Sequence, residues 1–180
     1  MRKVKTDKPM KKKDDMNNRT NGWSKLIVIF HLSFLVLFAA CDGSVYYDES
    51  RPVNEHGWLP TDILTFDVDV DDTTHLFDFL VSVRNSVSYP YSNTFLFINT
   101  TFPDGSVARD TLECQLADAS GRWHGKRTGR YVDARYRLRG ASARFPMEGL
   151  YRFEVTNGMR DSAITGLKDI SLRIEYAKKK

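Results

Sequence analysis

Apolar and polar residues alternate one by one in several segments after residue 57, and this period of two is typical of β-strands. The clearest segment is Leu64–Val70, LTFDVDV, in which the alternation is strict. Because successive side chains of a strand point to opposite faces, one face of such a strand is apolar and can pack against a core. Six further segments have the same pattern or are rich in aromatic and β-branched residues: His75–Arg84, Thr94–Phe102, Ser106–Leu116, Ala134–Arg139, Gly149–Val155 and Ile170–Tyr176.

Turn residues separate these segments, and none of the segments keeps the spacing of an amphipathic helix. Pro103-Asp104-Gly105 lies between two expected strands and predicts a hairpin, and Asn157-Gly158 ends another strand. We therefore expect an all-β fold, an antiparallel β-sandwich, with a jelly roll as one arrangement that fits. The expected domain covers residues 57–177, and the lysines at 178–180 form a solvated basic tail.

The first 40 residues have a different pattern, in which a basic segment precedes a single apolar run. Nine of residues 1–25 are Lys or Arg, and the run at 26–40 has only His31 and Ser33 as polar members. A basic region, an apolar region and small residues before a cleavage point make a secretory signal peptide. The apolar run is shorter than the about 20 residues that span a membrane, which favours a cleaved signal over an uncut signal anchor.

A cysteine follows the small residues directly, in Phe38-Ala39-Ala40-Cys41. This segment resembles the lipobox of bacterial lipoproteins, although Phe38 stands where a smaller aliphatic residue is usual. The resemblance implies that the Cys41 thiol is lipidated and that acyl chains anchor the product in a membrane outside the cytoplasm. Residues 41–56 are then expected to be the lipidated cysteine and a flexible tether, since the segment is polar and without a period.

Removal of the signal changes the charge balance. The whole chain has a formal net charge of +4, whereas residues 42–180 hold 18 Lys and Arg against 20 Asp and Glu, a net charge of −2. The basic character therefore belongs largely to the signal, and a nucleic-acid partner is not expected.

The remaining charges are unevenly placed, because residues 42–120 are acidic and residues 121–160 are basic. Arg135, Arg137 and Arg139 fall at alternate positions, so one face of an expected strand is cationic. One interpretation is that these arginines pair with acids of the first half, such as Asp67, Asp69 and Asp71. The other is a docking face for an anionic partner, to which Arg would make bidentate contacts.

The common catalytic motifs are absent from the sequence, and we expect neither a cofactor nor a metal. Asp67, Asp69 and Asp71 could approach Ca²⁺, but the glycine and the final glutamate of an EF-hand loop are missing, so a solvated strand face is favoured. Cys114 is in phase with apolar neighbours and is expected to be a buried free thiol. The chain is therefore predicted to be non-catalytic.

Three aromatic residues lie in expected loops: Tyr89 and Tyr91 flank a proline, and Trp123 lies between two glycines in Gly121-Arg122-Trp123-His124-Gly125. Exposed aromatic rings on the loops of a sandwich can stack on sugar rings or anchor a protein partner. Burial as caps of the core is the alternative for Trp123 and one tyrosine.

These residues belong to a series of short motifs: Trp58-x-x-x-Asp62, Val83-Arg84-Asn85, Tyr89-Pro90-Tyr91-x-Asn93, Pro103-Asp104-Gly105, Asp110-Thr111 and Gly121-x-Trp123-x-Gly125. In order and spacing, and with the lipobox, they resemble the gliding-motility lipoprotein family GldH of the Bacteroidetes. The resemblance implies an outer-membrane lipoprotein needed for gliding, in the context of type IX secretion, with no enzymatic activity and with other envelope proteins as partners. The alternative function is a carbohydrate-binding lipoprotein that uses the loop aromatics on a glycan.

A Bacteroidetes source would imply a modification as well. Exported proteins of that phylum are commonly O-glycosylated at Asp-Ser/Thr followed by an apolar residue or Thr. Three segments fit this pattern, which makes Thr73, Thr111 and Ser162 candidate acceptors. Ser162 is the first choice, because it follows the Asn157-Gly158 turn.

Overall fold

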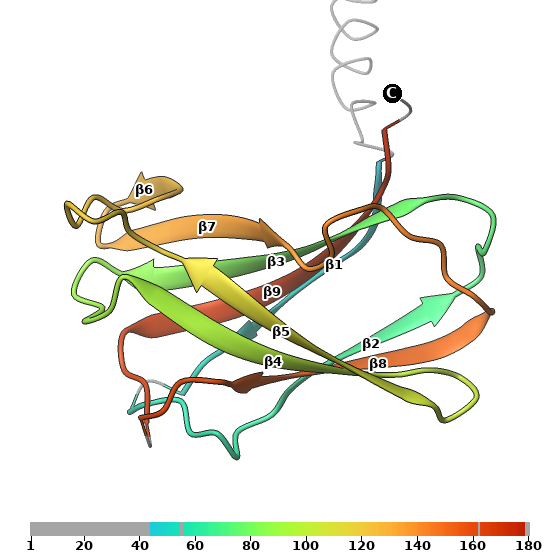
Figure 1. Cartoon of the computed structure of the whole chain (residues 1–180), viewed down its shortest axis with the longest axis horizontal. Helices are drawn as coiled ribbons and strands as arrows, with labels where there is room; N and C mark the ends of the chain where they lie inside the picture. Colours follow the sequence, from blue (N-terminus) through green and yellow to red (C-terminus); the bar gives the residue numbers. More distant parts are fainter. Residues whose placement is uncertain (1–43, 55, 162, 179–180) are drawn as a thin grey trace, which may run out of the picture. The chain divides into compact units, whose positions relative to one another are not determined.

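Two antiparallel sheets packed face to face make up the part of the chain that the computed structural model describes, residues 44–54, 56–161 and 163–178 (Figure 1). Described residues form nine strands and no helix: β1 (Val45–Pro52), β2 (Leu64–Val70), β3 (Phe77–Ser86), β4 (Asn93–Thr101), β5 (Val107–Gln115), β6 (Lys126–Thr128), β7 (Tyr131–Arg137), β8 (Gly149–Asn157) and β9 (Leu167–Tyr176). The expected all-β sandwich is thus confirmed. The described residues also contain no helix of the length and apolarity that a membrane crossing needs.

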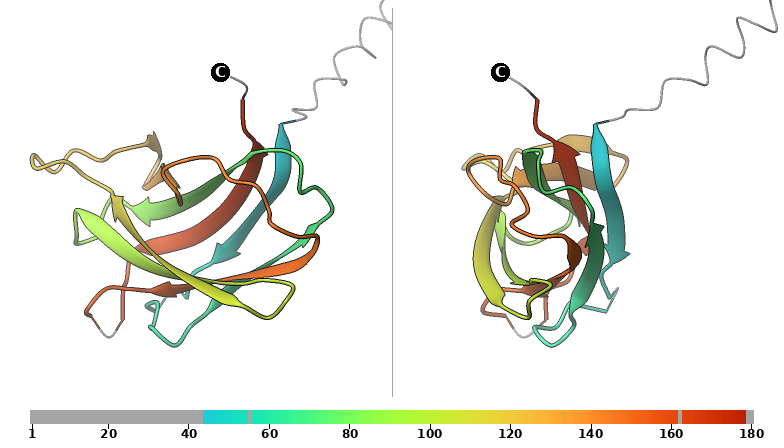
Figure 2. Two further views of the ribbon diagram at one scale, coloured as in Figure 1. Left: turned by 45° about the vertical axis from the view of Figure 1, so that its right-hand side comes forward. Right: turned by 90° about the vertical axis from the view of Figure 1, so that its right-hand side faces the viewer.

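The strand order is that of a jelly roll with one added strand. One sheet has the order β1-β9-β3-β7-β6 and the other the order β2-β8-β4-β5. Without β6, the first strand pairs with the last, the second with the next to last, and so on inward to the β4–β5 hairpin. This is the pairing of a long hairpin rolled into two layers, which the two views of Figure 2 show from other directions.

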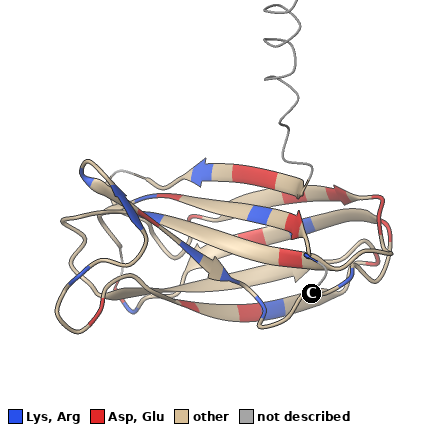
Figure 3. Ribbon diagram, turned by 90° about the horizontal axis from the view of Figure 1, so that it is seen from above, with Lys and Arg blue, Asp and Glu red and all other residues tan. Residues whose placement is uncertain are grey.

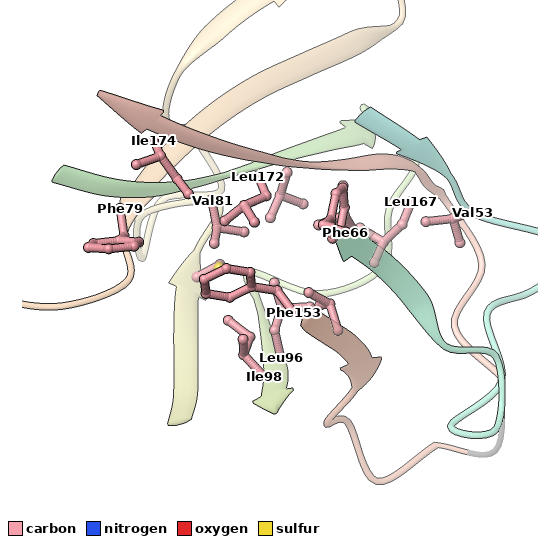
Figure 4. Close-up of a cluster of buried hydrophobic side chains, with 14 of the residues drawn as sticks. Val53, Phe66, Phe79, Val81, Leu96, Ile98, Phe153, Leu167, Leu172 and Ile174 are labelled. Atoms are coloured by element: carbon pink, nitrogen blue, oxygen red, sulfur yellow. The ribbon is translucent and has the colours of Figure 1, made fainter. Parts of the chain in front are cut away.

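The core fills the space between the two sheets (Figure 4). Strict alternation in β2 places Phe66, Val68 and Val70 inward and leaves Asp67 and Asp69 exposed. Each of the other long strands of the interior contributes a similar row, including Phe79 and Val81, Leu96 and Ile98, Phe153 and Val155, and Leu172 and Ile174. Burial of this apolar surface, at about 25 cal/mol per Å², is the main favourable term in folding.

The structure differs from the sequence expectation at the start of the domain. Residues 45–52 were expected to belong to a flexible tether, but they form β1, which pairs with β9 from Val45 opposite Glu175 to Pro52 opposite Asp169. The apolar residues Val45, Tyr46 and Tyr47 are consecutive and show no alternation, and the strand is held by main-chain pairing with β9 and by packing of the two tyrosines against the core. Cys41 and the signal at 1–40 lie outside the described residues.

Candidate interaction surfaces

The arginines predicted to form a cationic face lie on or just after β7, and they have acidic partners. Arg137 donates two hydrogen bonds to Asp78, and Arg139 lies 3.4 Å from Asp110. Arg135 is 4.0 Å from Glu175 and donates a weaker bond to Ser82. Of the two interpretations, pairing within the domain is therefore the one that the geometry supports.

The acids that pair with these arginines are not the ones expected. Asp67 instead faces Arg152 across the β2–β8 ladder, and Arg152 Nε and Nη2 donate to its carboxylate at 2.8 and 3.1 Å. Hydrogen bonds from Arg152 hold the pKa of the Asp67 carboxyl below its usual range. Asp71 accepts a hydrogen bond from the Tyr46 hydroxyl at 2.7 Å. The pairing therefore follows strand register, which the sequence alone does not reveal.

Further ion pairs tie neighbouring strands of the five-stranded sheet together. Arg173 on β9 donates to Asp48 and Glu175, and Arg84 on β3 donates to Asp133 at 2.6 Å. Figure 3 shows Lys and Arg positions interspersed with Asp and Glu positions along the strands. The outer face of this sheet is therefore largely neutralised from within.

The expected acidic strand face of β2 is exposed, as predicted. Among the residues described, no three His, Cys, Asp or Glu side chains come close enough together to hold a metal ion.

The loop aromatics do not form an exposed stacking platform. Tyr89 is only 4% exposed and its hydroxyl donates to the Asn93 carbonyl at 3.2 Å, so the expectation of a contact surface is wrong for this residue. Tyr91 packs edge-on against Tyr89 and donates to Asp161. Trp123 is half-buried against the core. Burial dominates because the segments between strands fold back over the open end of the sandwich.

Cys114 is a free thiol, fully buried in the core as expected. Burial, with a smaller contribution from the charge of Glu113, raises the pKa of the thiol to about 12. A thiol in this state is a poor nucleophile, because the thiolate is the reactive form.

A small cavity lies between the two sheets beside Phe79, Thr100 and Phe153, with Arg139 and Arg144 at its lining. Its volume is about 40 Å³. Ligand pockets for small molecules are typically several hundred Å³, so the cavity is too small to favour such a function.

A surface that the sequence analysis missed is the outer face of the four-stranded sheet. We call it the Phe97 face and define it by the outward residues Phe95, Phe97, Asn99, Val107, Thr111, Leu150 and Thr156. Phe97 is 41% exposed, and cross-strand pairing places Thr111 and Thr156 on either side of it. Val107 and Leu150, 64% and 53% exposed, lie toward one end of the same face.

Charged side chains surround the centre of the Phe97 face. Glu113 lies opposite Phe95, Arg109 lies opposite Asn99, and the Asp67–Arg152 pair lies toward the β2 edge. The period of two predicts which residues point outward here. It does not predict that Phe97 lies between threonines of two neighbouring strands, because that depends on register.

A second surface is the hairpin of β6 and β7, with Lys126, Arg127 and Arg130 exposed. Among the described residues, no carboxylate lies within 4 Å of the charged groups of these three cations. These three cations belong to the basic segment 121–160, but they lie outside the row of Arg135, Arg137 and Arg139.

Thr111 is an exposed residue of the edge strand β5, and Thr73 is half-buried in the β2–β3 connection. Ser162, like the lipidation candidate Cys41, lies outside the described residues. All four assignments stay predictions.

Comparisons with known proteins place these features in a family context. A family model described as GldH lipoprotein matches residues 45–174. A protein named gliding motility lipoprotein GldH homolog, from Christiangramia forsetii, is 30% identical over 162 residues, which is 86% of this chain and 96% of the relative. The gliding motility lipoprotein GldH of Flavobacterium johnsoniae is 29% identical over 154 residues, or 82% of this chain and 94% of the relative.

Among solved structures, the crystal structure of dimeric latent PorU from Porphyromonas gingivalis aligns with 77% of this chain at 11% identity and a TM-score of 0.31. The aligned part is 14% of the PorU chain.

Proposed function

Since this chain belongs to the GldH lipoprotein family, we propose that it is a non-catalytic accessory protein, anchored to the outer membrane by lipid on Cys41. In this proposal it acts through contacts with other envelope proteins, in the context of gliding or type IX secretion. The relatives from Christiangramia and Flavobacterium are covered almost over their full length, so the comparison concerns the whole protein. The basic and apolar signal followed by Cys41 supports the anchoring part of the proposal.

The observation that carries the contact function is the Phe97 face. Aromatic side chains are enriched in the buried centres of protein interfaces, where charged side chains are depleted, while polar residues form the rim. Phe97 with Thr111 and Thr156 fits such a centre, and Glu113 and Arg109 fit such a rim.

The carbohydrate-binding alternative has less support. It requires exposed aromatic rings in line over a groove, but Tyr89 is buried and the Tyr91 hydroxyl is occupied by Asp161. Trp123 is half-buried on a different loop. The exposed phenyl ring of Phe97 lies between threonines with charged side chains around them, a pattern that favours protein contact.

The test is crosslinking of the tagged full-length lipoprotein in envelope membranes, followed by capture. Phe97→Asp should abolish the capture of partner proteins, because a charge at the centre of an interface must be desolvated without a partner. Leu76→Asp is the matched control, since Leu76 is 45% exposed but lies in the β2–β3 connection, away from the Phe97 face.

The control variant should capture the same proteins as the wild type, and both variants should keep the wild-type melting temperature. The capture is compared with that of an unrelated outer-membrane lipoprotein. The contact function is rejected when the wild type captures no protein that the unrelated lipoprotein does not also capture. Equal capture by Phe97→Asp and wild type rejects the Phe97 face as its site.

A further inference from the structure

The positive charge of the domain is neutralised everywhere along β7 but not at the β6–β7 hairpin. Arg135, Arg137 and Arg139 each have an acidic neighbour within 4.0 Å. In the described part of the chain, Lys126, Arg127 and Arg130 have none at that distance. Asp133 lies directly opposite Lys126 on the ladder, but its carboxylate already accepts from Arg84 Nε at 2.6 Å.

The backbone of the hairpin is held in place by its turn and by a hydrogen bond to the end of β3. Gly129, with φ of +61°, takes the first central position of the turn, where a two-residue hairpin favours glycine. The Arg130 carbonyl accepts from the Val87 amide at 2.9 Å, which ties the turn to the end of β3. A preorganised surface loses less entropy on binding than a mobile one.

The side chain of Arg127 is also positioned. Its Nε donates to the Gly129 carbonyl at 3.1 Å. Within the described residues, no hydrogen bond or ion pair occupies the two terminal nitrogens of this guanidinium. Planar guanidinium groups bind carboxylates through two parallel hydrogen bonds, which is the contact these nitrogens can make.

The hairpin occupies the corner of its sheet that lies diagonally opposite the anchored strand end. β1 and β6 are the two edge strands of this sheet. At the end of the sheet away from Val45, one cross-strand row runs from β1 to β6 through Pro52, Asp169, Arg84, Asp133 and Lys126. Ladder spacings place Lys126 roughly 30 Å from Val45. The four residues from Cys41 to Val45 reach at most about 14 Å.

We propose that the β6–β7 hairpin, through Lys126, Arg127 and Arg130, binds an acidic segment of another envelope polypeptide. The free cations supply charge complementarity for a run of carboxylates. The proposed lipid on Cys41 is joined to the start of β1 by a short segment, and the hairpin lies roughly 30 Å from that strand end, which favours a protein partner over lipid headgroups. This inference gives a partner chemistry to the proposed contact function and rests on that function, but it uses a surface separate from the Phe97 face.

The test measures binding of a fluorescent peptide of alternating Asp and Gly to the full-length lipoprotein in neutral detergent micelles. Anisotropy should report binding that weakens as salt rises, since screening reduces the attraction between exposed charges. The variant Lys126→Glu, Arg127→Glu, Arg130→Glu should weaken binding by about tenfold or more.

The matched control is Arg135→Glu, Arg137→Glu, Arg139→Glu, which changes the net charge by the same amount at positions that already have acidic partners. It should change peptide affinity by less than about threefold, and net charge alone then does not explain the loss in the hairpin variant. Melting temperatures exclude unfolding of either variant. Equal losses in the two variants overturn the proposal.

A second arm uses vesicles of phosphatidylglycerol and of phosphatidylcholine, with a Cys41→Ser background that removes the anchor. Hairpin-dependent binding to the anionic vesicles, without binding of the acidic peptide, overturns the proposal in favour of a lipid contact. The Phe97→Asp variant distinguishes the two surfaces. A variant that binds the peptide like the wild type but captures no partner has lost the Phe97 face and kept the hairpin.

Discussion

Arg137 and Asp78 face each other diagonally across the β3–β7 ladder, and both terminal nitrogens of the arginine donate to the carboxylate. The Ser142 hydroxyl donates to the same carboxylate, so Asp78 links two neighbouring segments. The Arg137 side chain remains 43% exposed and that of Asp78 18%. Solvent therefore screens this pair, although its bidentate geometry is favourable.

A double-mutant cycle with Arg137→Ala and Asp78→Ala should give a coupling energy of about 0.5–1 kcal/mol, in the upper range for exposed pairs. Urea unfolding of the four proteins measures it. Partner capture should be unchanged in Arg137→Ala, because pairing within the domain is the function assigned to this arginine. A loss of capture with an unchanged free energy of unfolding would restore the docking interpretation of the β7 arginines.

Cys114 predicts a weakening of the fold in alkali. Its folded pKa of about 12 lies above that of an unfolded thiol, which is about 8.5. The contribution of the buried thiol to the free energy of unfolding is therefore complete below about pH 8.5. It is lost as the pH rises toward the pKa of the folded state. Near pH 10 the free energy of unfolding should fall more steeply in the wild type than in Cys114→Ala, by about 1.4 kcal/mol per pH unit.

Burial raises the pKa of Tyr89 and Tyr136 as well, and the charge of Cys114 contributes to both shifts, so the difference between the two slopes includes this coupling. Equal slopes for wild type and Cys114→Ala would show that the thiol is hydrated in the folded state.

Gly125 should tolerate no side chain. A Cβ atom there would lie 2.1 Å from the Asp133 carbonyl oxygen, and its φ of +88° is unfavourable for other residues. Gly125→Ala should therefore lower the free energy of unfolding by about 2 kcal/mol or more, since strain and a main-chain clash act together. Gly140→Ala is the control, because a Cβ atom at Gly140 would meet no atom of a non-neighbouring residue within 4 Å; its effect should stay within about 0.5 kcal/mol.

Cys41→Ser should abolish lipidation, because the acceptor thiol is lost. Mass spectrometry of the mature N-terminus should find acyl chains on the wild type and none on the variant. The variant should also leave the membrane fraction. An unmodified Cys41 in the wild type, or a retained segment 1–40, contradicts the lipoprotein assignment.

O-glycosylation is expected at one or more of Thr73, Thr111 and Ser162 when the protein is taken from a Bacteroidetes envelope. Thr111 is exposed on an edge strand and Thr73 is half-buried, but a glycan on Thr111 would cover the centre of the Phe97 face, so Ser162 stays the first choice. Peptide masses of the native protein test all three sites, and Ser162→Ala should remove the added mass from its peptide alone. Unmodified peptides at every site reject the prediction.

The period of two predicted seven of the strands because each buries one face against the core, as β2 does with Phe66, Val68 and Val70. It missed β1 and β6, which lie at the two edges of one sheet: β1 starts with three consecutive apolar residues, and β6 is three exposed residues held by main-chain pairing with β7. Main-chain pairing leaves no mark on the order of apolar and polar residues.

The candidate surfaces were harder to predict for a related reason. The sequence identifies Arg135, Arg137 and Arg139 as one row, but the acids that neutralise them come from β3, β5 and β9. Burial of Tyr89 likewise depends on how its loop folds over the core. Both outcomes follow from register and connection geometry between distant segments, which a single sequence does not encode locally.

The pairing of β1 with β9 so close to Cys41 has a mechanical consequence. With the lipid proposed on Cys41, a force applied at that lipid would enter the domain through the start of β1. The ladder from Val45 opposite Glu175 to Pro52 opposite Asp169 would then resist in shear, so that its hydrogen bonds share the load. A flexible tether of the same length would only stretch, whereas a strand paired with β9 would pass tension from the proposed anchor into the sandwich.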